Sequence, residues 1–101
     1  MLESAYVHCL AFRLAERGVS IKREVGVPVV FEQVKLECGY RADMVVGGKV
    51  VVEVKSIDAI ADIHVAQTLT YLRFLNLRLG ILLNFNSVLM KNGIRRVVNN
   101  L

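Results

Sequence analysis

The chain has 101 residues, of which 54% are hydrophobic and 22% charged, with one proline and a formal net charge of +4. This composition excludes an intrinsically disordered chain, and the length predicts one domain with a modest core. The basic excess is compatible with a polyanionic partner, and solubility explains it equally well.

No apolar run is long enough to span a membrane, and the first ten residues lack the basic start of a signal peptide. Cys9 and Cys38 match no metal-ligand spacing and are expected to be buried free thiols. We therefore expect a cytoplasmic protein without a membrane partner. From Ile63 onward the chain carries five basic residues and no acidic one. Either this half faces phosphates or it is simply a solvated surface.

The expected order of elements is helix, three strands, helix and strand, followed by a tail that forms a last small strand or turn. The ranges are 2–18, 19–32, 34–46, 49–57, 58–78, 79–86 and 93–99. The first helix has an apolar stripe and ends at Gly18, a typical C-terminal cap. Its stripe contains Leu2, Tyr6, Cys9, Leu10 and Leu14.

The three strands form a meander in the simplest arrangement. The first bends near Gly26 and Pro28, because proline is confined to strand edges and bulges. A tight turn at Gly47–Gly48 joins the second strand to the third, so these two pair antiparallel. Asp58 is the expected N-terminal cap of the second helix. The apolar run that follows this helix is typical of a strand buried on both faces.

Two carboxylates and a lysine converge in the predicted hairpin. Alternation puts Arg41 and Asp43 on one face of the second strand. On the third strand, Glu53 and Lys55 share a face. Positions 43 and 53 are similarly distant from the turn and therefore lie near one another.

Opposed carboxylates are unfavourable unless a divalent cation lies between them. Mg²⁺ takes one or two carboxylates and leaves positions for a phosphate, while an adjacent lysine stabilises developing negative charge. This pattern is typical of phosphodiester hydrolysis.

The second helix adds a polar side at positions 64, 67, 68 and 71. Gln67 and Tyr71, four residues apart, can hold a water, the lysine or a phosphate. Each signal also has an ordinary explanation. Glu-x-Lys is commonly a solvated ion pair, Asp43 can be a polar strand end, and Tyr71 can belong to the core. The joint order of Asp, Glu-x-Lys and Gln-x-x-x-Tyr on matching elements favours a site.

In this joint pattern the chain resembles the PD-(D/E)XK nuclease superfamily and, within it, the family named after its GxxExxY motif. The resemblance covers nearly the whole chain. "LESAY" matches the ExxY half of the motif, "GYRADMVV" the strand with the first metal carboxylate, and "VVEVKSI" the Glu-x-Lys strand. "IHVAQTLTYL" matches the following helix, and "LGILLNFN" and "GIRRVVN" resemble the closing segments.

The resemblance implies an α/β fold of the restriction-endonuclease-like class, with an αβββαβ core and a mixed sheet flanked by helices. It implies Mg²⁺ or Mn²⁺ at Asp43 and Glu53, with Lys55 as the catalytic lysine. Glu3 would be an additional metal carboxylate, and Gln67 and Tyr71 would be accessory. The implied activity is metal-dependent cleavage of DNA.

The chain departs from the pattern at two places. Ala42 stands where the superfamily name has proline, and the glycine of GxxExxY would fall one position before Met1. We therefore expect a single nuclease-like domain over residues 1–101 that lacks the helical start of its relatives. The apolar surface left uncovered would favour a homo-oligomer.

The first functional hypothesis is a hydrolase, a metal-dependent deoxyribonuclease in which Arg41 or Arg73 contacts backbone phosphates. The preference for DNA rests on the resemblance alone. The second is a non-catalytic nucleic-acid-binding module that retains the fold, with the basic C-terminal half as its surface. The third is an assembly domain in which the polar cluster is a structural ion pair.

Overall fold

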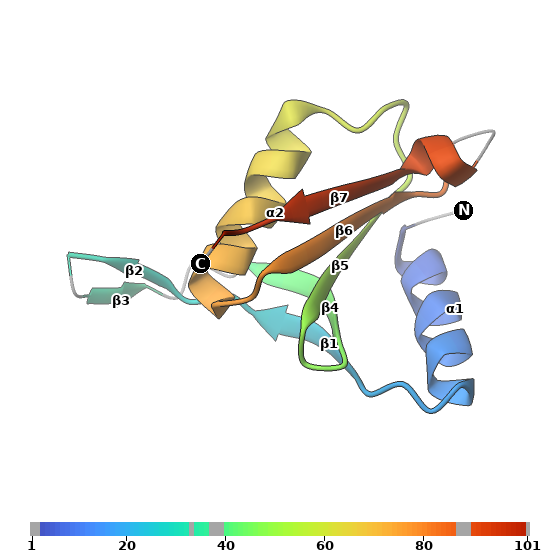
Figure 1. Cartoon of the computed structure of the whole chain (residues 1–101), viewed down its shortest axis with the longest axis horizontal. Helices are drawn as coiled ribbons and strands as arrows, with labels where there is room; N and C mark the ends of the chain where they lie inside the picture. The colour runs from blue at the N-terminus through green and yellow to red at the C-terminus, as the bar shows by residue number, and fades with distance from the viewer. Residues whose placement is uncertain (1–2, 33, 37–39, 87–89, 101) are drawn as a thin grey trace.

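The computed structural model describes residues 3–32, 34–36, 40–86 and 90–100. The helices are α1 (Glu3–Glu16) and α2 (Asp62–Leu75), with a short 3₁₀ turn η1 (Met90–Gly93). The strands are β1 (Ile21–Gly26), β2 (Val29–Phe31), β3 (Val34–Leu36), β4 (Arg41–Val46), β5 (Val50–Lys55), β6 (Leu79–Asn84) and β7 (Ile94–Val98). Five of these strands form one sheet in the order β1-β4-β5-β6-β7 (Figure 1). The sheet is mixed, since β5 and β6 are parallel and the other neighbours are antiparallel.

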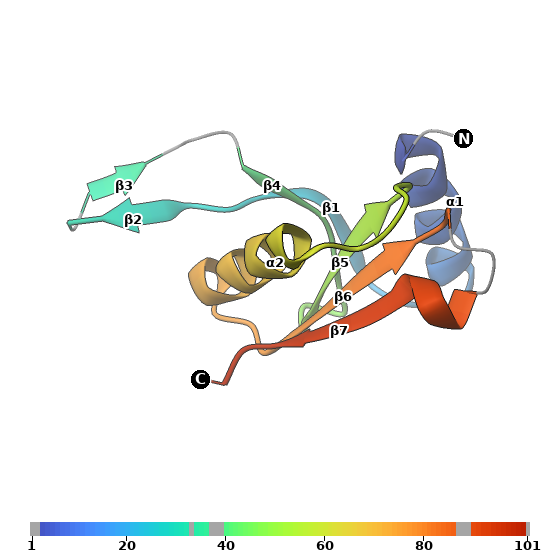
Figure 2. The ribbon, with the colours of Figure 1, turned by 90° about the horizontal axis from the view of Figure 1, so that it is seen from above.

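The two helices cover opposite faces of this sheet, as Figure 2 shows from above. On one face, Val7 of α1 packs with three buried side chains of β4 and β5, namely Met44, Val52 and Val54. On the other face, α2 packs its buried side chains on β4, β5, β6 and β7. The expected restriction-endonuclease-like α/β class, with a mixed sheet flanked by helices, is confirmed.

The connection from β5 to β6 positions α2 on the sheet. Parallel neighbours cannot be joined by a tight turn, so the chain crosses over through a helix. The helix lies close to β6 at Gly80, where an added Cβ would stand 2.7 Å from Cγ2 of Thr68. Only glycine allows this approach. The turn between β4 and β5 is also as expected, since Gly47 and Gly48 have φ of 61° and 69°, a conformation that favours glycine.

The predicted antiparallel meander is present as β1, β4 and β5, but the first two expected strands are each divided. The expected strand 19–32 is split into β1 and β2, and the expected strand 34–46 contains β3 and β4. β2 and β3 pair only with each other, and Figure 1 shows this hairpin projecting from the main sheet. The break coincides with Pro28, where no backbone N–H is available for a ladder. The main sheet therefore pairs β1 directly with β4. Cys38 lies outside the described residues.

Three local expectations were wrong or incomplete. Helix α2 begins at Asp62, and the residue before it is Ala61 rather than Asp58. The ring of His64 accepts a hydrogen bond from the Ala61 N–H at 2.8 Å and so closes the helix start. Cys9 is exposed and free, not buried, because Val7 takes the position that faces the sheet. The final tail forms a strand, β7, against β6.

Within the described ranges, neither helix has the length and hydrophobicity to cross a membrane.

Candidate active site

Asp43 and Glu53 are joined by two reciprocal hydrogen bonds between neighbouring strands. The Asp43 N–H donates to Oε2 of Glu53 at 2.8 Å, and the Val54 N–H donates to Oδ2 of Asp43 at 2.7 Å. The regular β4–β5 ladder runs from Val46↔Val50 to Met44↔Val52. At the next position along the strands, the backbone N–H groups of Asp43 and Val54 donate to the two side-chain carboxylates instead of to backbone carbonyls. The predicted proximity of positions 43 and 53 is therefore present in the structure.

The carboxylates face the α2 side of the sheet. Val45 and Val51 belong to the core beneath α2, and side chains two residues apart on a strand share a face. Asp43, Glu53 and Lys55 consequently point to that same side. Glu53 is 3% exposed, whereas Asp43 and Lys55 are half-buried.

Burial and a like charge make the ionised form of Glu53 unfavourable. Its pKa is raised from 4.5 to about 8, first by desolvation and then by the negative charge of Asp43. A side-chain hydrogen bond with Asp43 also raises the pKa of Glu53. The Asp43 N–H and the positive charge of Lys55 lower it and offset only part of the increase. A cation between the carboxylates would stabilise their ionised forms and so oppose this shift.

Lys55 is the last residue of β5 and lies in register with Asn84, the last residue of β6. Asn84 is 1% exposed, and its side-chain amide forms hydrogen bonds with both the N–H and the carbonyl of Ile57. The Ile57 N–H donates to Oδ1 at 3.1 Å, and Nδ2 donates to the Ile57 carbonyl at 2.9 Å. Asn84 therefore fixes the loop that leaves β5 directly after Lys55.

Tyr71 of α2 lies beside the carboxylate pair. It is 5% exposed, and its pKa is raised first by burial and then by the negative charges of Glu53 and Asp43. Tyr71 is therefore a core residue that also lies next to the carboxylate pair. Gln67 lies one turn earlier on the same side of α2 and is half-buried. In the part of the chain that the structure describes, its side chain makes no hydrogen bond.

Glu3 reaches the same end of β5 from the first turn of α1. Its Oε2 accepts a hydrogen bond from the Ser56 N–H at 2.9 Å, one residue beyond Lys55. It does not join the carboxylate pair, since the described residues contain no group of three or more metal-binding side chains. The structure places Glu3 at the rim of the site.

The carboxylate pair fits a divalent ion. Each carboxylate uses one oxygen for a backbone N–H, and no described backbone N–H contacts Oδ1 of Asp43 or Oε1 of Glu53. Two carboxylate oxygens are a common protein contribution to a Mg²⁺ site, in which waters complete the coordination.

Arg41 and Arg73 are both exposed, at the start of β4 and in the last turn of α2. The single ion pair among described residues, Arg13–Glu16, involves neither of them.

Sequence reasoning missed Asn84 and Tyr40. Asn84 could have been found from the sequence, because it is a polar residue near the end of the apolar run "LGILLNFN". Tyr40 is 50% exposed, and its presence contributes to the raised pKa of Tyr71.

A model of the PD-(D/E)XK nuclease superfamily matches residues 1–97. The chain belongs to this superfamily. Comparisons with curated proteins and with solved structures give no significant match. Members of the PD-(D/E)XK superfamily generally use divalent metal ions, and membership implies a nuclease that binds nucleic acid.

Proposed function

We propose that this chain is a Mg²⁺- or Mn²⁺-dependent nuclease that hydrolyses phosphodiester bonds in DNA. The observation that carries the proposal is the pair formed by Asp43 and Glu53. The raised pKa of Glu53, about 8, shows that two ionised carboxylates are unfavourable side by side in this buried position, and a bound cation would stabilise the ionised pair. The preference for DNA and the assignment to the GxxExxY family rest on the motif resemblance, as does a single nuclease domain over residues 1–101.

In this proposal Asp43 and Glu53 would hold the ion. The bound ion would neutralise phosphate charge and lower the pKa of a water. Lys55 projects from the same strand face as Glu53 and stabilises the charge that develops on the phosphate.

The remaining candidates support this group. Tyr71 closes the side of the site beneath α2 and, with Gln67, orients the substrate. Glu3 holds the segment after Lys55 through Ser56, outside the carboxylate pair. Arg41 and Arg73 are proposed backbone-phosphate contacts. A cytoplasmic location is part of the proposal and agrees with the exposed free thiol of Cys9. Self-association stays a prediction.

Incubation of labelled single- and double-stranded DNA with the purified protein and Mg²⁺ or Mn²⁺ tests the activity. Cleavage should require the ion and should be lost in Lys55→Ala. Cleavage that persists in Lys55→Ala would point to a contaminant and contradict the assignment. Arg17→Ala, an exposed change at the end of α1, is the matched control for loss of a positive charge.

A further inference from the structure

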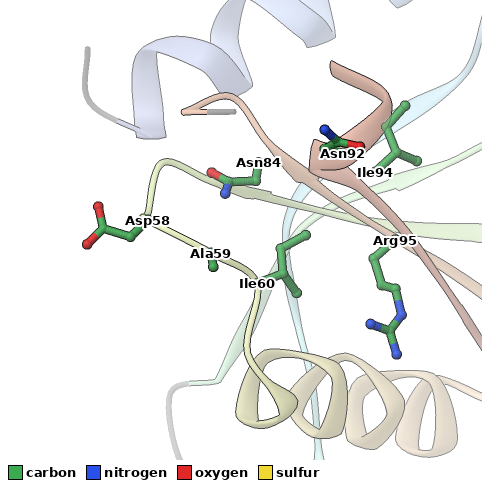
Figure 3. Close-up of a pocket in the computed structure, with 7 residues that line it drawn as sticks. All are labelled: Asp58, Ala59, Ile60, Asn84, Asn92, Ile94 and Arg95. Carbon is green, nitrogen blue, oxygen red and sulfur yellow. The ribbon is translucent and has the colours of Figure 1, made fainter. Parts of the chain in front are cut away.

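A cavity of about 360 Å³ lies next to the segment that Asn84 fixes. Three parts of the chain line it, namely the loop before α2, the end of β6, and the η1–β7 segment (Figure 3). Its volume lies within the range of small-ligand pockets. The cavity is distinct from the carboxylate pair, because neither Asp43 nor Glu53 lines it.

Arg95, one of the lining residues, lies directly across the sheet from Glu53, with one residue of β6 between them. Glu53 is paired with Leu82 on β6, and Leu82 is paired with Arg95 on β7. Leu82 and Val97 belong to the core beneath α2, so Arg95 also points to the α2 side. Two strand spacings separate Glu53 from Arg95, which corresponds to about 10 Å between their backbones.

The polar groups open to a ligand here are donors suited to an anion. Arg95 and Asn92 are exposed, and within the described segments neither side chain makes a hydrogen bond or an ion pair. In Figure 3 the Arg95 side chain extends from β7 toward α2, beside Ile60. The carboxylate of Asp58, the acidic residue of the lining, points away from Arg95. The Asn84 amide is already hydrogen-bonded to Ile57, so Asn84 lines the cavity without a free donor for a ligand.

We propose that this cavity binds a second phosphate of the substrate polynucleotide through the guanidinium of Arg95. This inference rests on the proposed nuclease function and adds a substrate-binding subsite to it. Neighbouring phosphates of a DNA strand lie further apart than the axial rise of about 3.4 Å per nucleotide, so a separation of about 10 Å corresponds to roughly one or two phosphates from the scissile one. The cavity exceeds a phosphate in size, and its apolar walls at Ala59 and Ile60 accept the attached sugar.

Arg95→Gln and Arg96→Gln form a matched pair for the test. Both arginines are exposed neighbours on β7, and Arg96 faces the opposite side of the sheet by alternation. Each variant is combined with Lys55→Ala, so that bound DNA is not cleaved. Fluorescence anisotropy then measures the binding of a labelled decathymidylate, with and without a terminal phosphate, at several salt concentrations.

Arg95→Gln should weaken binding by roughly tenfold, because a charge-assisted phosphate contact is lost. It should also reduce the slope of log affinity against log salt by about 1. Arg96→Gln should change the affinity by less than about twofold. Circular dichroism and thermal unfolding should show both variants folded as the parent is, since both side chains are exposed.

The outcomes separate the subsite from the nuclease proposal. Equal losses in the two variants would mean general electrostatic attraction and would overturn the subsite alone. A parent that binds no oligonucleotide would overturn the nuclease proposal and the subsite together. A loss at Arg95 that is independent of the terminal phosphate supports an internal diester as the ligand. If Arg95→Gln weakens binding only of the oligonucleotide that carries the terminal phosphate, the subsite is supported, and its ligand is the phosphate at a chain end.

Discussion

Replacing Glu53 by glutamine should stabilise the metal-free protein increasingly as the pH rises. The folded-state pKa of about 8 lies above the ordinary value of 4.5, so the folded protein retains the Glu53 proton to higher pH than the unfolded chain does. This contribution to stability is fully present below pH 4.5 and is lost as the pH rises through about 8. Glutamine keeps the shape, cannot ionise, and therefore avoids the loss.

The expected size follows from the two pKa values. Their difference of 3.5 units (8 − 4.5) corresponds to a total loss of about 5 kcal/mol. The Glu53→Gln variant should be more stable than the parent by about 1 kcal/mol at pH 5 and by about 4 kcal/mol at pH 8. For a domain of this length, the difference at pH 8 corresponds to a rise in Tm of roughly 15 °C or more.

Urea and thermal unfolding in EDTA, from pH 5 to pH 8, measure this difference. Glu16→Gln, an exposed change on α1, is the control and should give a small difference that does not grow with pH. A Glu53→Gln variant that is less stable than the parent at pH 8 would refute the reasoning. In that case the Glu53 charge would be held by a structural partner such as Lys55, as the assembly-domain hypothesis requires.

Three further results are expected. Mn²⁺ should raise the Tm of the parent more at pH 8 than at pH 6, because the ion competes with the proton of Glu53, and isothermal titration should show proton release. An effect of Mn²⁺ that is independent of pH would contradict this linkage. Asn84→Ala should cost about 3 kcal/mol in urea unfolding, since buried backbone groups lose their partners, whereas the exposed change Asn92→Ala should stay within about 0.5 kcal/mol. Equal effects of these two would argue against the loop anchor. Gly80→Ala should lower the free energy of unfolding by about 1 to 3 kcal/mol because its Cβ would lie 2.7 Å from a side-chain carbon of α2. Gly26→Ala, which has open space, is its control and should be nearly neutral.

The sequence predicted those parts of the fold that depend on local signals. The glycine pair at 47–48 specifies the β4–β5 hairpin, and with it the register that brings Asp43 to Glu53. A second helix was expected between the third strand and the last apolar run, and α2 lies there between β5 and β6. The bend near Pro28 was predicted, but local preference does not indicate that β2 and β3 pair with each other away from the main sheet.

The site was predictable only where strand alternation and turn geometry determine it. Alternation placed Lys55 on the face of Glu53, and helical spacing placed Gln67 one turn from Tyr71. The contact of Glu3 with Ser56 joins residues 53 positions apart and leaves no local signal. The row from Glu53 to Arg95 depends on the strand order β5-β6-β7, which the sequence pattern alone does not specify.

Direct measurement of divalent-ion binding tests the central claim most closely. Isothermal titration of the metal-free protein with Mn²⁺ at pH 8 should give one ion per chain. Asp43→Asn and Glu53→Gln should each weaken this binding by at least tenfold while the chain stays folded. No binding by the parent, or binding that survives both substitutions, would contradict the assignment of these two carboxylates as the metal site.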